Sequence, residues 1–568
     1  MESRRVDGAY PSTDELFEEV SQLLEALAAT AGPGYFLDEV REWLDQIRIF
    51  GFHLTCLDVR QDSRVHGPVM AEILAQAGLC DNFAERSPDE QAQLLAETLG
   101  VDVKLDEESL SEAAQETLRL FRLLRRAAKS YGASALGGHV ISMTRNAADI
   151  LTVLWLWRMP TTDLAAEEST DSGPLPIMPL FETIDDLERA PQILRSLFGF
   201  PAYREHLAAM GDRQTVMIGY SDSTKDGGYL TACWSLYHCQ TTLRELAAEA
   251  GIELTFFHGR GGSLGRGGGP TTSSILSLPP GSVDGALRLT EQGEVLADKY
   301  DDPAIAHRHL ELVMWSALIV SGSPPATAAP EWRETMQTLS TRAFAAYREL
   351  FDKPGFVDFF RRVTPISEIE QLPIGSRPAR RKGGGQLKDL RAIPWVFSWT
   401  QARCLVPAWF GLGTALTSMV DDPESLERLR TMYREWTFFR VTIDNAELAL
   451  AKTDLQIAEC YANLARDTAE LMKIGAFVAE EYERSVRGVL AVTGNDELLS
   501  GTAWLRESIR VRNRYIDPLN LIQVELLRRL RKCQEEEANE AAAAREEELR
   551  HLTRLSIAGI ASGMRTSG

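Results

Sequence analysis

The sequence predicts a TIM-like parallel β/α barrel, incomplete in this chain, with extensive additional α-helices that make the protein predominantly α-helical. Short apolar segments alternate with longer amphipathic segments over the first 400 residues. Most of the short segments end in a polar or charged residue, as barrel strands do at their carboxyl ends. A complete barrel has eight strands. We find about six in this sequence, so we expect the barrel to be incomplete.

Each expected strand brings a polar residue or a loop to the same end of the barrel. Arg60 follows the first strand, Glu182 the third and Asp222 the fourth, and a glycine-rich loop follows the fifth. We expect strands at 53–59, 139–143, 177–181, 215–220 and 252–257, with a sixth candidate at 392–397. We expect helices at 12–31, 37–50, 68–77, 111–130, 147–157, 184–198, 229–250, 447–465 and 518–532.

These elements divide into two expected regions. Residues 1–400 hold the partial barrel, its inserted helices and the loops at the strand ends. Residues 401–568 form an α-helical C-terminal region, since the pattern after Trp399 is helical almost to the end.

The glycine-rich loop after the fifth strand is the most informative stretch. Seven of the eleven residues from Gly259 to Gly269 are glycine, and the only charged ones are Arg260 and Arg266. Such a loop leaves backbone N–H groups free to turn toward an anion, and arginine can bind phosphate or carboxylate oxygens with two hydrogen bonds. A flexible linker is the alternative, but a linker is typically uncharged and lacks a preceding apolar strand. We therefore favour an anion site, which matches neither the Walker nor the dinucleotide pattern.

Composition narrows the partners and the location. The formal net charge of −22 argues against nucleic acid and anionic membranes as partners. Seven scattered cysteines without a Cys-x-x-Cys pair indicate reduced thiols. No apolar run has membrane-spanning length and the first residues lack an apolar secretory core, so we expect a cytoplasmic protein.

Four further residues could carry chemistry, and each has an ordinary alternative. Glu182 and Asp222 offer hard oxygen ligands for Mg²⁺ or Mn²⁺, although single carboxylates are often caps or salt-bridge partners. Lys225, expected in a loop, could neutralise a phosphate or simply lie on the surface. His258 could contact a substrate or be a buried structural histidine.

Two long motifs carry a resemblance to a known family. The stretch His258-Gly259-Arg260-Gly261-Gly262-Ser263-Leu264-Gly265-Arg266-Gly267-Gly268 looks like the phosphate-site loop of phosphoenolpyruvate carboxylases. The stretch from Val216 to Gly228 resembles the second signature of that family, and the likeness runs from Phe50 to Arg565. It implies carboxylation of phosphoenolpyruvate by bicarbonate to oxaloacetate and phosphate, through carboxyphosphate and a metal-bound enolate, with Mg²⁺ or Mn²⁺ as cofactor.

The resemblance also assigns roles to individual residues. It implies that Glu182 and Asp222 are metal ligands. It also places five arginines in the active site, a number that suits a site holding two mutually repelling anions. The implied catalytic residues are Lys225, His258, Arg260 and Arg266, and the implied substrate-binding residues are Arg60, Arg377 and Arg391.

A regulatory site and an assembly are implied in the same way. Lys452 and Arg512 match positions that bind a dicarboxylate inhibitor, aspartate or malate. The family commonly has asparagine where this chain has Thr566, so we expect weaker feedback inhibition. Members of the family are homotetramers.

The chain departs from the family at its front. Family members are longer there and carry a catalytic histidine in a Thr-Ala-His-Pro-Thr signature, but no His-Pro-Thr occurs in this sequence. We therefore expect the C-terminal portion of such an enzyme. Two alternatives stay open. One is a non-catalytic chain that binds phosphoenolpyruvate or dicarboxylates or assembles with a full-length subunit. The other is a different metal-assisted enolate barrel, such as a pyruvate-phosphate enzyme, for which no Walker-type nucleotide loop is visible.

Overall fold

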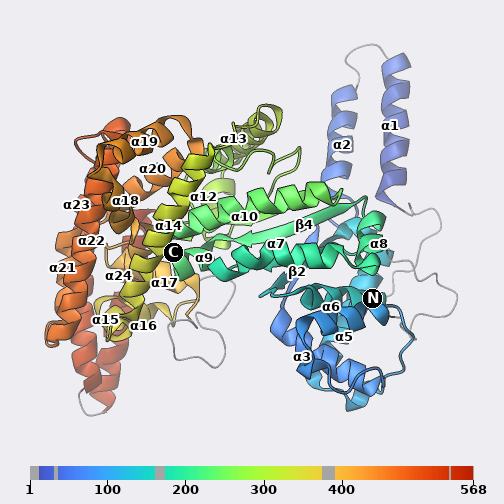
Figure 1. The fold of residues 1–568 in the computed structure, drawn as a ribbon, viewed down its shortest axis with the longest axis horizontal. Helices are drawn as coiled ribbons and strands as arrows, with labels where there is room; N and C mark the ends of the chain where they lie inside the picture. The colour runs from blue at the N-terminus through green and yellow to red at the C-terminus, as the bar shows by residue number, and fades with distance from the viewer. Residues whose placement is uncertain are drawn as a thin grey trace. The chain divides into compact units, whose positions relative to one another are not determined.

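The computed structural model describes Tyr10 and residues 12–30, 36–159, 173–373, 390–535 and 539–566. It confirms the predicted fold class, because six strands form a curled half-barrel sheet and most of the chain is helical (Figure 1). The strands lie in sequence order, and the pairs β1–β2, β2–β3 and β5–β6 are parallel. They are β1 (Leu57–Asp62), β2 (Leu136–Ser142), β3 (Ile177–Phe181), β4 (Arg213–Gly219), β5 (Glu253–Gly259) and β6 (Arg288–Leu289).

One predicted strand is wrong, and one strand of the sheet was not predicted. Residues 392–397 belong to helix α17 (Ala392–Gln401) and not to a sixth strand. A short apolar run does not distinguish a buried strand from a buried helix, and Pro394 lies in the first turn of α17, where a helix tolerates proline. The sixth strand is β6, whose two residues are too few to produce an alternating pattern.

Residue contacts divide the chain into two compact units. The first comprises the described residues up to Leu180, together with Gln192–Val216 and Ala250–Glu253. In this unit α5 and α6 pack against β2, and α3 packs against β1 and both of these helices (Figure 1). Buried Arg125 on α5 donates to the carbonyl oxygens of Leu156, Trp157 and Met159 at the end of α6. Its helices are α1 (Thr13–Thr30), α2 (Leu37–Phe50), α3 (Ser63–Gln76), α4 (Pro88–Glu97), α5 (Glu112–Tyr131), α6 (Ala147–Arg158) and α8 (Pro201–Ala209).

The second unit comprises Phe181–Pro191, Met217–Glu249 and the described residues from Leu254 onward. Helix α7 (Ile184–Phe198) begins in this unit. The remaining helices are α9 (Tyr220–Gly227), α10 (Tyr229–Glu249), α11 (Thr271–Leu276), α12 (Gly293–Tyr300), α13 (Pro303–Gly322), α14 (Pro330–Asp352), α15 (Phe356–Val363), α16 (Ile366–Ile369), α17, α18 (Leu412–Val420), α19 (Pro423–Glu435), α20 (Thr437–Lys452), α21 (Leu455–Ala462), α22 (Ala469–Thr493), α23 (Ala503–Glu535) and α24 (Glu540–Met564).

A buried polar network fixes the C-terminal helices of the second unit. The amide of Asn520 on α23 donates to the carbonyl of Gln401 at 2.9 Å, and the amide of Gln523 donates to the hydroxyl of Ser556 on α24 at 2.9 Å. The expected helix 447–465 is two helices, α20 and α21, because the carboxylate of Asp454 caps a new N-terminus. Among the described helices, none is both long and apolar enough to cross a bilayer. The predicted domain division at residue 400 stays a prediction.

Candidate active site

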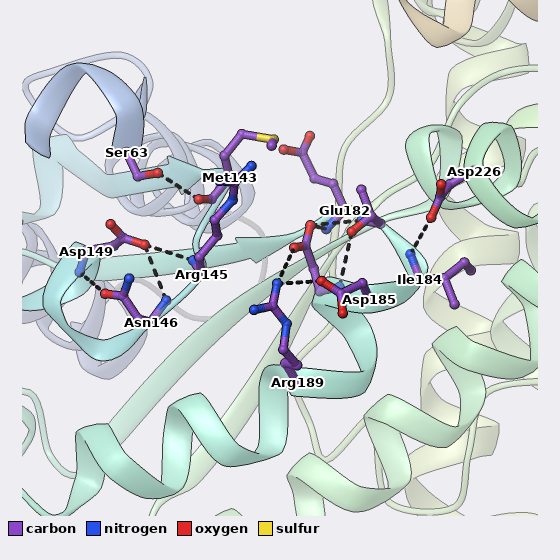
Figure 2. Close-up of polar contacts among 12 residues, drawn as sticks. Ser63, Met143, Arg145, Asn146, Asp149, Glu182, Ile184, Asp185, Arg189 and Asp226 are labelled. Carbon is purple, nitrogen blue, oxygen red and sulfur yellow. Dashed lines mark hydrogen bonds and ion pairs between the residues drawn. The ribbon is translucent and has the colours of Figure 1, made fainter. Parts of the chain in front are cut away.

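The turn after β3 holds Glu182 in a fixed backbone position (Figure 2). One carboxylate oxygen of Asp186 accepts from the N–H groups of Glu182 and Thr183, at 3.4 and 3.0 Å. Asp226 on α9 accepts from the N–H of Ile184 at 3.1 Å. Burial raises the pKa of Asp226, and the bond from Ile184 opposes that rise. Glu182 itself is buried, so its carboxylate lies in a site from which bulk water is largely excluded.

The end of β4 packs directly against Glu182. A methyl group at Gly219 would lie 3.2 Å from Glu182 Cγ, so only glycine allows this close approach without a shift. Asp222 lies three residues further along, in the first turn of α9. The two carboxylates expected to bind metal therefore come from neighbouring strand ends, as the sequence predicted.

Lys225 lies on helix α9, and the prediction of a loop there is wrong. The hydroxyls of Ser223 and Thr224 donate back to the carbonyls of Gly219 and Tyr220 at 2.7 and 2.8 Å, so these turn-forming residues are accommodated in a helix. The Nζ of Lys225 donates to the carbonyl of Leu390.

The glycine-rich loop is tightly folded by its own backbone. The N–H of Gly261 donates to the carbonyl of Arg266 at 2.9 Å, and the N–H of Gly268 donates to the carbonyl of Ser263 at 2.7 Å. The N–H groups of Arg266 and Gly267 also bond within the loop. We predicted that the loop's N–H groups turn toward an anion, and these four do not. The arginine side chains are therefore the stronger candidates for binding an anion.

Both arginines of the loop are held in place by neutral groups. Arg266 is 1% exposed and donates to Ser221 Oγ at 3.2 Å and to Gln292 Oε1. Arg260 donates to the carbonyl of Gly267 at 2.9 Å and to Ser274 Oγ at 2.6 Å. These four partners are uncharged, and they orient the two guanidinium groups.

His258 is buried inside β5 next to this loop. It is 1% exposed, and its Nδ1 lies 2.9 Å from the hydroxyl of Tyr220. Burial, reinforced by the positive charge of Arg260, lowers the pKa of His258 to about 3. The imidazole is therefore neutral at physiological pH. Burial favours the structural alternative raised by the sequence.

Glu182 and Asp222 suit a magnesium or manganese ion. Mg²⁺ is typically bound by one or two carboxylates, with waters and substrate oxygens completing six positions. Within the described ranges, no group of three or more potential metal-ligating side chains occurs. Glu182 and Asp222 supply the kind of oxygen ligand that such an ion takes.

The structure describes two of the three predicted substrate-binding arginines, Arg60 and Arg391. Arg60 lies within β1, paired with Val140 on β2. The predicted bounds of this strand, 53–59, are wrong, because β1 begins at Leu57 and ends at Asp62. Arg391 lies immediately before α17. Arg377 lies outside the described residues.

A basic cavity adjoins the glycine loop. It has a volume of about 170 Å³, and its lining includes Ser263 of the loop, Lys452, Arg565 and Thr566. Burial, together with the positive charges of Arg512 and Arg565, lowers the pKa of Lys452 to about 8. Arg512 also donates to the carbonyl of Gly563 at 3.0 Å. The structure thus brings the three residues of the predicted dicarboxylate site to one region.

Several residues of these sites were missed by the sequence reasoning. Ser221 and Gln292 orient Arg266, and Tyr220 bonds His258. Arg565, in the left-handed conformation at φ 50°, adds a cation to the basic cavity. The motif from Val216 to Gly228 contains Tyr220 and Ser221, and Arg565 directly precedes Thr566. Nothing in the local sequence marks Gln292.

A parallel sheet with carboxylates and an arginine-bearing loop at its strand ends is typical of α/β enzymes that bind anionic ligands. The sequence profile described as Phosphoenolpyruvate carboxylase matches residues 2–568. The chain belongs to the phosphoenolpyruvate carboxylase family.

Curated relatives named Phosphoenolpyruvate carboxylase match nearly the whole chain. The protein from Aromatoleum aromaticum is 43% identical over 569 residues, which are 98% of this chain and 60% of the relative. The proteins from Nocardia farcinica and Gloeobacter violaceus are each 42% identical, over the same shares of both chains. The chain thus spans about 60% of the length of the curated relatives it matches.

The neutral state of His258 predicts a pH dependence of stability. The unfolded chain binds a proton at this histidine below about pH 6.5, but the folded protein does so only near pH 3. The contribution of neutral His258 to the free energy of unfolding is therefore fully present above pH 6.5. Below that pH it falls by about 1.4 kcal/mol per pH unit. We expect the wild type to lose about 2 kcal/mol more than His258→Asn between pH 7 and pH 5 in urea unfolding.

His307 provides the control for this measurement, because its side chain is 77% exposed. We expect His307→Asn to keep the wild-type dependence on pH. Equal losses in wild type and His258→Asn would contradict a neutral buried imidazole.

Proposed function

We propose that this chain carries out the chemistry of phosphoenolpyruvate carboxylase, a carbon–carbon lyase that converts phosphoenolpyruvate and bicarbonate into oxaloacetate and phosphate. The observation that carries the proposal is the pair Arg260 and Arg266, whose guanidinium groups are oriented by hydrogen bonds in the same unit as Glu182 and Asp222. Family membership supports the same activity.

The chemistry joins two anions that repel each other. An oxygen of bicarbonate attacks phosphorus, which gives carboxyphosphate and the enolate of pyruvate. Carboxyphosphate releases CO₂ and phosphate, and the enolate carbon then attacks CO₂ to form oxaloacetate. Fixed positive charge lowers the repulsion in the first step and stabilises the enolate in the second.

Each residue has a proposed part in this reaction. Glu182 and Asp222 would hold Mg²⁺ or Mn²⁺, which supplies charge neutralisation for the substrate oxygens when it is bound. Arg260 and Arg266 would bind and orient the two anions. Lys225 would neutralise phosphate charge from α9. Exclusion of water by the loop would keep the enolate from being protonated to pyruvate. Arg60, Arg377 and Arg391 stay predicted substrate contacts.

A non-catalytic chain remains the second candidate, because the chain spans about 60% of its relatives. Such a chain would bind phosphoenolpyruvate or dicarboxylates without turnover. Oxaloacetate formation from phosphoenolpyruvate, bicarbonate and Mg²⁺ by the purified 568-residue chain separates the two. Turnover supports the enzyme, and binding without turnover supports the second candidate.

Arg266 gives the sharpest test of the mechanism. In an active enzyme that contains this chain, we expect Arg266→Ala to lower bicarbonate-dependent turnover about 100- to 1000-fold, as loss of a charge-stabilising donor does. Oxaloacetate is measured by coupled reduction to malate, and circular dichroism checks the fold.

Arg308→Ala is the matched control, because that arginine lies on the surface of the same unit with 68% of its side chain exposed. We expect it to keep full turnover. Near-normal turnover in Arg266→Ala would remove the glycine loop from the mechanism.

We also propose that the basic cavity binds a dicarboxylate inhibitor such as aspartate or malate. Lys452, Arg512 and Arg565 bring three positive charges close together, and each carboxylate of the ligand would pair with one or more of them. The Ser263 hydroxyl is buried without a partner among the described residues, and so is that of Thr566. A ligand here would lie against the glycine loop. A cytoplasmic location and a homotetramer stay predictions.

Thr566→Asn tests this cavity. Asparagine restores an amide donor that threonine lacks. One added hydrogen bond of about 1 kcal/mol would tighten binding of aspartate about fivefold. Isothermal titration calorimetry measures the change, and Thr338→Asn on the exposed face of α14 is the control. Unchanged or weaker binding in Thr566→Asn would contradict the proposed contact.

A further inference from the structure

Tyr220 and His258 form an isolated pair under the glycine loop. Tyr220 begins α9, His258 lies near the end of β5, and the phenol oxygen is 2.9 Å from Nδ1. The other ring nitrogen, Nε2, is buried and has no hydrogen-bond partner among the described residues. Both side chains line one cavity of about 70 Å³, together with Arg260.

The hydrogen bond between Tyr220 and His258 can be protonated in two ways. Only one of them leaves a single polar group of the pair without a partner among the described residues. If Tyr220 donates to Nδ1, the proton of the neutral ring lies on Nε2, and that N–H is the one group left over. If Nδ1 instead carries the proton and donates to Tyr220, both the phenol O–H and the bare Nε2 lack a partner. Each buried polar group left unpaired costs about 1–3 kcal/mol. The first arrangement is therefore favoured.

The charge of Arg260 favours the same arrangement. Its guanidinium lies 6.0 Å from the centre of the Tyr220 ring. A cation beside the phenol makes the O–H a stronger donor and opposes a second proton on the imidazole. His258 then presents an N–H donor and cannot serve as a base at Nδ1, because the phenol occupies that nitrogen.

The glycine loop locks Tyr220 in this position. Gly267 has φ 75°, in the left-handed region, and a methyl group there would lie 2.5 Å from Tyr220 Cβ. The loop backbone thus lies directly on the tyrosine, and Arg260 bonds the same Gly267 through its carbonyl at 2.9 Å. One loop segment therefore fixes both Tyr220 and Arg260.

From this geometry we propose that Tyr220 is a positioning residue, which holds His258 as the Nε2–H tautomer so that it donates to an oxygen of the bicarbonate bound beside Arg260. The bicarbonate part of this statement rests on the proposed function. The tautomer part depends only on the structure of the free chain.

Nitrogen-15 NMR of the chain with labelled histidine rings tests the tautomer directly. His258→Asn identifies the signals of His258. We expect the wild type to show one neutral tautomer with its proton on Nε2, unchanged from pH 8 to pH 5. Tyr220→Phe is expected to lose this single tautomer and to show the Nδ1-protonated form or a mixture.

Tyr229→Phe is the matched control. Tyr229 lines the same cavity, but its hydroxyl pairs with Asn445 and Cys233 instead of a histidine. We expect this variant to keep the wild-type tautomer. A proton on Nδ1 in the wild type, or an unchanged tautomer in Tyr220→Phe, would overturn the proposal, and the first result requires no variant to fold.

Titration with bicarbonate in the same experiment tests the functional part. We expect the Nε2 signal to shift on binding, with affinity about tenfold lower in Tyr220→Phe and within about twofold in Tyr229→Phe, because one hydrogen bond to an anion is worth about tenfold. If the Nε2–H tautomer is seen but bicarbonate causes no shift, the proposed function fails at this site and the tautomer assignment stands. If bicarbonate binds equally to wild type and Tyr220→Phe, the positioning role is overturned while the proposed function survives.

Discussion

The buried guanidinium of Arg266 is the constraint on which the rest of the site depends. A buried charge that loses its hydrogen bonds costs several kcal/mol, so the loop must keep Arg266 beside Ser221 and Gln292. Those partners lie 45 and 26 residues away in the sequence. The hydrogen bonds of this one side chain therefore join the glycine loop to the start of α9 and to the segment before α12.

Glycine makes these contacts possible by allowing backbone to approach closely. A methyl group at Gly261 would lie 2.5 Å from Arg266 Cβ, and one at Gly268 would lie 2.4 Å from the carbonyl oxygen of Gly262. At both positions the missing side chain is what lets the loop fold on itself. The glycines thus allow the loop to fold compactly and do not make it flexible. The compact loop fixes the directions of the arginine side chains.

Much of this could be predicted from sequence, for physical reasons. The loop follows an apolar strand and carries its charges at two positions, so its place at a strand end was predictable. The place of Glu182 and Asp222 at neighbouring strand ends was predictable, because parallel strands gather their carboxyl ends. Gln292 was not, because pairing across 26 residues leaves no local pattern. Helix α17 was mistaken for a strand because an apolar run has no visible period.

Hydrogen exchange at the amides of Gly261, Arg266, Gly267 and Gly268 tests the central claim most directly. All four bond within the loop. If the loop is a built site, these amides exchange on the order of a hundredfold more slowly in the substrate-free chain than in an unstructured peptide of the same sequence. Exchange at the rate of the free peptide would show a flexible linker instead, and the arginines would then have no fixed direction before substrate binds.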